Sequence, residues 1–239
     1  MTSSRPAPGR SLGATPSPER TTHDADRGGL DLLGALRAAW ANAPLLLLGS
    51  VAVTAAMLLV VVMLRAGVLV AAPVGLLLVP PTVMALVRTC CDVVDGRDPS
   101  IGEYGRWLGR LAPRAIGIGA VPLVLAALTR LALFAHEQGG GPLMLVPAGL
   151  GATGTVLVLL ASLVLLPMRA VDGSVTGVRA WLYALHLFAS SPVPYLAAAI
   201  VGVLGVSLAV TVSNGLFLVV PAPFALLLAM AWTVGRAGG

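Results

Sequence analysis

The densest group of potentially reactive side chains lies between residues 88 and 98. It comprises two adjacent thiols and three carboxylates: Cys90, Cys91, Asp92, Asp95 and Asp98. Thiolates and carboxylates can bind metal ions, but Arg88 and Asp92 have the spacing of a helical ion pair and Asp95 suits a turn. The three histidines are far apart along the chain. We therefore expect reduced thiols, no metal site and no cofactor.

A glycine-rich motif at residues 149–154, Gly-Leu-Gly-Ala-Thr-Gly, matches the dinucleotide-binding fingerprint. That fingerprint needs a preceding strand and an acidic residue beyond the following helix, whereas this copy lies inside a long apolar stretch. Small residues let membrane helices approach closely, and Gly202 and Gly205 have the same character. We predict helix packing at both places.

Arg130 is the charged side chain placed deepest in an apolar stretch. An arginine at the centre of a bilayer costs about 2.5–3.5 kcal/mol on insertion scales. At a rise of about 1.5 Å per residue, Arg130 lies roughly 8 Å from its helix end, so its side chain can reach the headgroups. Two interpretations stay open: a structural arginine, or an outward-facing contact for an anion or substrate together with His136 and Glu137.

Two groups of prolines also lie in apolar stretches, Pro80 and Pro81 before Thr82, and Pro221 and Pro223. A proline within a helix removes a hydrogen bond and kinks the helix. Broken helices form substrate sites in transporters, whereas kinks can also be accommodated by neighbouring helices. The sequence leaves both interpretations open.

Six long apolar stretches determine the class of the protein. They cover approximately residues 45–64, 67–87, 115–135, 143–168, 193–212 and 216–234. Each is close to the roughly 20 residues that cross about 30 Å of hydrocarbon. Hydrophobic residues make up 57% of the chain and charged residues 10%, against about 25% charged in soluble domains. We predict an all-α membrane protein with six transmembrane helices.

The arginines predict the orientation. If the six stretches alternate across the membrane, 13 of the 15 arginines fall on one side, and arginines near span ends mark the cytoplasmic side. Both termini are therefore predicted to be cytoplasmic, in the inner membrane of a bacterial cell. Residues 1–28 are too polar to order and predict a disordered tail, which leaves 29–239 as the six-span domain.

Three flanking segments carry apolar residues at helical spacing opposite charged ones, at residues 30–40, 100–111 and 174–185. Trp107 and Trp181 lie in the last two. We predict two or three cytoplasmic interfacial helices; the first segment could instead continue into the first span.

The connections after the second and fourth apolar stretches also resemble each other. Val94, Asp95 and Gly96 match Val171, Asp172 and Gly173, and the sequences around the two proline groups show a weaker similarity. Three parallel hairpins would explain the matches, and so would chance in so biased an alphabet.

The second span and its connection resemble a known family. The run from Pro81 to Arg88, the Val94 to Gly96 turn, and the segment through Tyr104 and Trp107 are similar to the YesL-like bacterial membrane proteins, a family of unknown function. Its members are often associated with carbohydrate permeases. The resemblance implies a membrane accessory role and no established active site.

The predicted function is therefore that of a non-enzymatic accessory or assembly subunit of a transport system, with carbohydrate as the predicted substrate of that system. The predicted partners are membrane lipids and a carbohydrate permease or another membrane subunit. A small transporter or channel acting alone is the alternative. Proton-coupled pumping and intramembrane proteolysis are disfavoured, because the spans hold no carboxylate relay and no facing nucleophile and base. The net charge of +5 is explained by arginines beside anionic headgroups and predicts no nucleic-acid partner.

The predicted orientation can be tested with topology reporters. A reporter that is active only in the periplasm should be active when fused after Gly140 or Ser213. It should be inactive after Arg97, Asp172 or Gly239, because these positions lie on the side of the spans where 13 of the 15 arginines fall. Periplasmic activity after Arg97 would overturn the assignment.

Overall fold

The computed structural model describes residues 32–139, 141–211 and 218–237, which are helical apart from short connections. The elements are α2 (Leu32–Ala41), α3 (Ala43–Leu64), α4 (Val68–Val94), α5 (Ile101–Glu137), the 3-10 helix η2 (Pro142–Met144), α6 (Leu145–Val171), α7 (Val178–Ser190), α8 (Pro192–Thr211) and α9 (Pro221–Ala237). The predicted all-α class is confirmed for these residues. The predicted tail, residues 1–28, and the start of the sixth stretch lie outside the described residues. Leu33–Gly239 form one compact unit.

Several helices are long and apolar enough to cross a membrane. Among the described residues these are α3, α4, α5 and α6, and α7 with α8 forms a fifth candidate bent by 97°. The bend suits an interfacial helix followed by a span, as predicted for this region. α9 has 17 residues, fewer than the roughly 20 of a full span. The chain is thus a multi-span membrane protein, and the number six stays a prediction.

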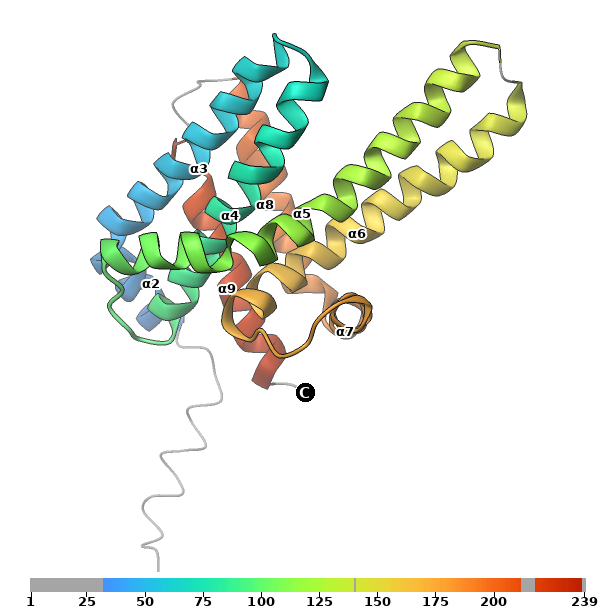
Figure 1. Ribbon diagram of the computed structural model, residues 1–239. Coiled ribbons are helices and arrows are strands. Elements are labelled where there is room, and N and C mark those ends of the chain that lie inside the picture. The colour runs from blue at the N-terminus through green and yellow to red at the C-terminus, as the bar shows by residue number, and fades with distance from the viewer. Residues whose placement is uncertain (1–31, 140, 212–217, 238–239) are drawn as a thin grey trace, which may run out of the picture. The chain divides into compact units, whose positions relative to one another are not determined.

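The segment predicted as a separate interfacial helix at residues 100–111 is instead the first part of α5. Ser100 and Glu103 form a capping box, in which the Ser100 hydroxyl accepts from the Glu103 N–H at 3.3 Å and the Glu103 carboxylate from the Ser100 N–H at 3.0 Å. The helix then continues through Pro113 to Glu137. In Figure 1, α5 first runs across the unit and then rises beside α6. A proline inside a helix can bend it without ending it, so the predicted interfacial segment and the third apolar stretch form one continuous helix.

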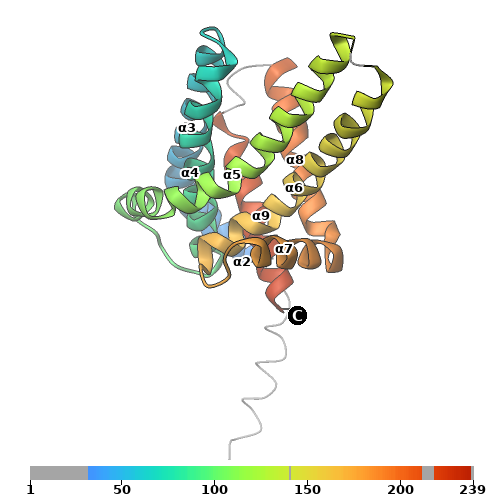
Figure 2. The ribbon, with the colours of Figure 1, turned by 45° about the vertical axis from the view of Figure 1, so that its right-hand side comes forward.

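The second half of α4 is the centre of the packing. Its buried side chains include Met84, Leu86 and Val87, and the buried residues of α6 and α9 join the same core. α4 packs against α3, α5 and α9, and Figure 2 shows α9 passing behind α5. The core of the unit therefore lies at this end of the helices.

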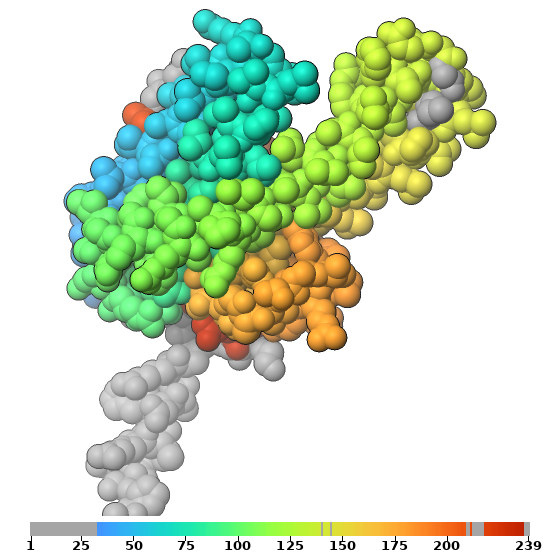
Figure 3. All heavy atoms as spheres, viewed as in Figure 1, coloured from blue at the N-terminus to red at the C-terminus, as the bar shows by residue number. Residues whose placement is uncertain are grey.

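The opposite half of the α5–α6 hairpin packs differently. Beyond Ile118, no described residue of α5 is buried, and before Ala161 only Ala148 of α6 is. On the face shown in Figure 3, the tip of this hairpin stands apart from the tip of α3 and α4. Apolar side chains exposed along a membrane helix require lipid or another membrane protein around them.

Gly151, Gly202 and Gly205 allow close helix contacts, as predicted, whereas a Cβ added to Gly149 or Gly154 of the fingerprint-like motif would meet nothing within 4 Å. A Cβ on Gly205 would lie 2.6 Å from Val220, and one on Gly202 would lie 3.0 Å from Phe224 of α9. Gly151, in the fingerprint-like motif, lies against Thr129 of α5. These glycines therefore serve helix packing.

The two proline groups occupy different positions in their helices. Pro80 and Pro81 lie inside α4, whereas Pro221 and Pro223 lie in the first turn of α9. N–H groups in the first turn of a helix have no helical acceptor, so prolines there remove no hydrogen bond. The interpretation of Pro221 and Pro223 as a kink within a span is therefore wrong. The sequence similarity between the two proline groups does not reflect equivalent positions in their helices.

Pro80 instead contributes to a helix contact. A Cβ added to Gly119 of α5 would lie 2.6 Å from Cγ of Pro80, whereas one added to Gly117, half a turn away, would meet nothing within 4 Å. The α4–α5 interface therefore depends on the missing side chain at position 119.

Gly119→Leu should consequently destabilise the protein while Gly117→Leu should not. We expect overpacking at position 119 to cost about 1–3 kcal/mol and to lower the midpoint of thermal unfolding in detergent micelles. Gly117→Leu provides the control for the change in helix propensity. Equal midpoints for the two variants would contradict the observed α4–α5 contact.

Candidate functional site: the arginine pocket and the apolar cavity

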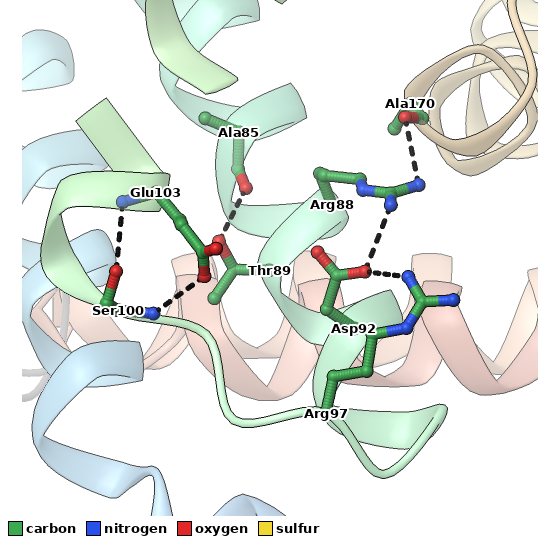
Figure 4. A network of polar contacts seen from close by, with 8 residues as sticks. All are labelled: Ala85, Arg88, Thr89, Asp92, Arg97, Ser100, Glu103 and Ala170. Atoms are coloured by element: carbon green, nitrogen blue, oxygen red, sulfur yellow. Dashed lines mark hydrogen bonds and ion pairs between the residues drawn. The ribbon is translucent and has the colours of Figure 1, made fainter. Parts of the chain in front are cut away.

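Arg88 connects three helices near the end of α4. Its guanidinium pairs with Asp92 one turn later at 3.0 Å and donates to the carbonyl oxygen of Ala170 in α6 at 3.4 Å. It also lies over the ring of Trp107 in α5, 4.8 Å from the ring centroid. Figure 4 shows the guanidinium between α4 and α6. Ala170 is the penultimate residue of α6, so its carbonyl has no helical donor, and Arg88 supplies one.

Asp92 is the carboxylate that balances this charge, and it is shared. Oδ1 of Asp92 also accepts from Arg97 at 2.9 Å. The Arg88 side chain is 12% exposed and that of Asp92 is 8%, whereas Arg97 is 63% exposed. Burial makes the Arg88 pairing the stronger one, because water screens Arg97.

The other two aspartates of this region have separate roles. Asp95 follows the last residue of α4, where Gly96 turns the chain with φ of 74°. Oδ1 of Asp98 accepts from the side-chain amide of Asn42 at 3.4 Å. Cys90 and Cys91 are buried free thiols. Within the described ranges, no group of three histidine, cysteine, aspartate or glutamate residues could hold a metal ion.

An arginine-lined pocket opens beside Arg88. We define the arginine pocket as the cavity of about 350 Å³ between α4, α5 and the end of α6. Its lining consists of Arg88, Trp107, Arg110, Leu111, Arg114, Ala170 and Val171. Arg110 and Arg114 are spaced by one helical turn, so they lie on the same face of α5.

The connection between α6 and α7 completes the surroundings of the pocket. A Cβ on Gly173 would lie 2.8 Å from Cζ of Arg114, so the guanidinium occupies the space beside this glycine. Arg169 donates to the carbonyl of Val175. The Ser174 N–H donates to Asp172 at 2.9 Å, and this bond, with the Ser174 side chain, lowers the pKa of the Asp172 carboxyl. Asp172 thus serves a turn, as its sequence neighbours predict.

A second, larger cavity lies among the apolar helices. We call it the apolar cavity; it has a volume of about 610 Å³, is partly open to the surroundings, and is lined by α3, α4, α6, α8 and the start of α9. Its lining is almost entirely apolar and includes Val53, Val83, Leu163 and Phe224. Ser207 contributes the one hydroxyl among the lining side chains.

The remaining predicted residues lie outside both cavities. Arg130 pairs with Glu137 at 3.3 Å, toward the end of α5, which is the direction that snorkelling requires; the alternative of an anion contact stays a prediction. The Thr82 hydroxyl donates to carbonyls of its own helix, to Leu78 at 2.8 Å and Val79 at 2.9 Å. Trp181 of α7 is half-buried against the core.

Sequence reasoning missed the arginines of the pocket as a site. Arg110 and Arg114 entered only the count that predicts orientation, Arg88 was considered only as the ion-pair partner of Asp92 and as part of the family-like run, and Trp107 only as an interfacial residue. The spacing of Arg106, Arg110 and Arg114 by four residues was the available signal, since it places three like charges along one helical face.

Comparison with protein-family models, with curated proteins and with solved structures finds no match to this chain. The resemblance to the YesL-like family therefore stays a prediction.

The two arginines that share Asp92 should differ in their contributions to stability. Arg88→Gln removes the partner of a buried carboxylate and the donor to Ala170, and we expect a loss on the order of 3 kcal/mol. Arg97→Gln removes an exposed partner of the same oxygen and should cost about 1 kcal/mol or less. Thermal unfolding of both variants in the same detergent measures the difference. A larger effect from Arg97→Gln would contradict the assigned roles.

Proposed function

We propose that this chain is a non-enzymatic accessory subunit of a membrane transport system and that it docks, within the bilayer, on another membrane protein. The apolar cavity is the observation that carries the proposal. A concave surface formed by α3, α4, α6, α8 and α9 can receive the side chains of a transmembrane helix. Packing in concave surfaces favours helix association in lipid, where hydrophobicity alone provides no drive.

The weak integration of α8 supports the same role. Among its described residues only Tyr195 and Ala198 are buried, whereas Val203 beside the cavity is 67% exposed. A helix that contributes so little to the core of its own chain has a long apolar face available for a neighbour. We infer that this face and the cavity form one docking surface.

The lining of the cavity favours this role over that of a carbohydrate carrier acting alone. A sugar presents several hydroxyl groups, and each one buried without a partner costs about 1–3 kcal/mol on the scale of protein mutations. Ser207 offers a single hydroxyl in return. The association with carbohydrate transport in particular rests on the resemblance to the YesL-like family.

Site-specific photocrosslinking in cells tests the docking surface. A photoreactive residue at position 203, beside the apolar cavity, should give a discrete adduct with a membrane protein. The same residue at position 131 of α5, where the native leucine is 63% exposed outside the cavity, should give lipid adducts only. Lipid adducts alone at both positions, or identical protein adducts from both, would argue against the proposal.

Transport measurements separate the two roles. Deletion of the chain should impair uptake of a carbohydrate only in cells that contain the captured partner. Purified protein that moves carbohydrate across liposomes without any partner would instead establish the transporter alternative.

A further inference from the structure

We propose that the arginine pocket is a binding site for a phosphate group. This inference goes beyond the accessory role and does not depend on it. The pocket differs from the apolar cavity in lining, helices and charge, and its ligand need not come from a partner protein.

The charge of the pocket is not balanced within the described part of the chain. Three guanidinium groups line it, those of Arg88, Arg110 and Arg114. The carboxylate in contact is that of Asp92, which is shared between Arg88 and Arg97. Arg110 and Arg114 pair with no carboxylate there, and like charges one helical turn apart repel each other. An anion between the arginines would relieve this repulsion.

The geometry of the arginines suits an oxyanion with several oxygens. Arg88 is fixed by Asp92, Ala170 and Trp107, so its position is set before any ligand binds. Arg114 lies in the space that Gly173 leaves free. Guanidinium groups present planar forks of N–H donors that match phosphate oxygens. Several such forks around one cavity favour phosphate over a single carboxylate, which has fewer oxygens and less charge.

The size of the pocket allows more than a bare ion. Its volume of about 350 Å³ corresponds to roughly twelve waters at about 30 Å³ each in the liquid. A phosphate ester with a small organic substituent therefore fits. The ester could belong to a phospholipid headgroup or to a soluble compound, and the chemistry of recognition is the same for both.

The position of the pocket along the helices is compatible with a lipid headgroup. Arg88 directly follows the predicted second span, and Trp107 is the residue type that concentrates at membrane interfaces. Basic pockets between membrane helices on the cytoplasmic side bind anionic headgroups in general. Competition between an anionic lipid and inorganic phosphate distinguishes a lipid headgroup from a soluble phosphate compound as the ligand.

Calorimetric titration of the purified full-length chain in a neutral detergent tests the site. The probes are inorganic phosphate, the short-chain anionic lipid dihexanoyl-phosphatidylglycerol, and its zwitterionic phosphatidylcholine counterpart, all at constant ionic strength. We expect saturable binding of one phosphate or one anionic lipid per chain. Weaker binding of the zwitterionic lipid is expected, because its headgroup carries no net negative charge.

Three variants locate the binding. Arg110→Gln combined with Arg114→Gln should weaken affinity at least about tenfold, since each charge-assisted hydrogen bond contributes that much or more. Gly173→Ala should also weaken it, because the added methyl displaces the Arg114 guanidinium. Arg106→Gln removes an equal charge on the same helix, from a side chain that pairs with Glu103 outside the pocket, and affinity should stay within about twofold.

Competition between the two probes identifies the ligand. Anionic lipid that displaces phosphate and binds more tightly identifies a headgroup site, and phosphate binding that the lipid does not displace identifies a soluble ligand. No saturable binding of either probe, or an equal loss of affinity in Arg106→Gln, would overturn the proposal. If the double variant does not fold, as judged by its circular dichroism and elution volume, unchanged affinity in Gly173→Ala would overturn it as well.

Discussion

The pairing of Arg88 with Asp92 is the constraint on which the end of the helical unit depends. Both side chains are largely buried, and a buried charge without a partner is strongly destabilising. The same guanidinium satisfies the carbonyl of Ala170 and covers the ring of Trp107. One side chain thereby ties α4 to α5 and α6 beside the arginine pocket.

The bilayer explains why the rest of the unit is packed so unevenly. In water, the exposed apolar faces of α5, α6 and α8 would drive collapse or aggregation. In lipid they carry no such penalty, so the helices are held together by close packing and by interhelical hydrogen bonds. The contacts between Gly119 and Pro80 and between Gly205 and Val220 are of this kind. The core is therefore dense where α4, α6 and α9 meet, and the outer part of the α5–α6 hairpin is free to face lipid or a partner.

The arginines of this chain have two physical roles at once. Each one beside a span favours the cytoplasmic side during insertion, and this requirement concentrates positive charge at one end of the helices. Once folded, Arg110 and Arg114 meet Arg88 across a small cavity with too few carboxylates to neutralise them. Arginines that favour one orientation in the membrane thus also give this cavity an excess of positive charge.

The helical class, the positions of four of the predicted spans and the turns at Asp95 and Asp172 follow from the sequence by itself, because hydrophobic length, glycine and turn residues act locally. The tight packing of Gly151, Gly202 and Gly205 follows for the same reason. The tertiary structure alone decided that α5 continues through Pro113, that Pro221 begins a helix, and that Arg88 reaches Ala170, 82 residues away. The convergence of Arg88, Arg110 and Arg114 also belongs to this second group. A site made of side chains from different helices depends on how those helices pack, and packing in a membrane depends on shape complementarity that no local pattern of residues encodes.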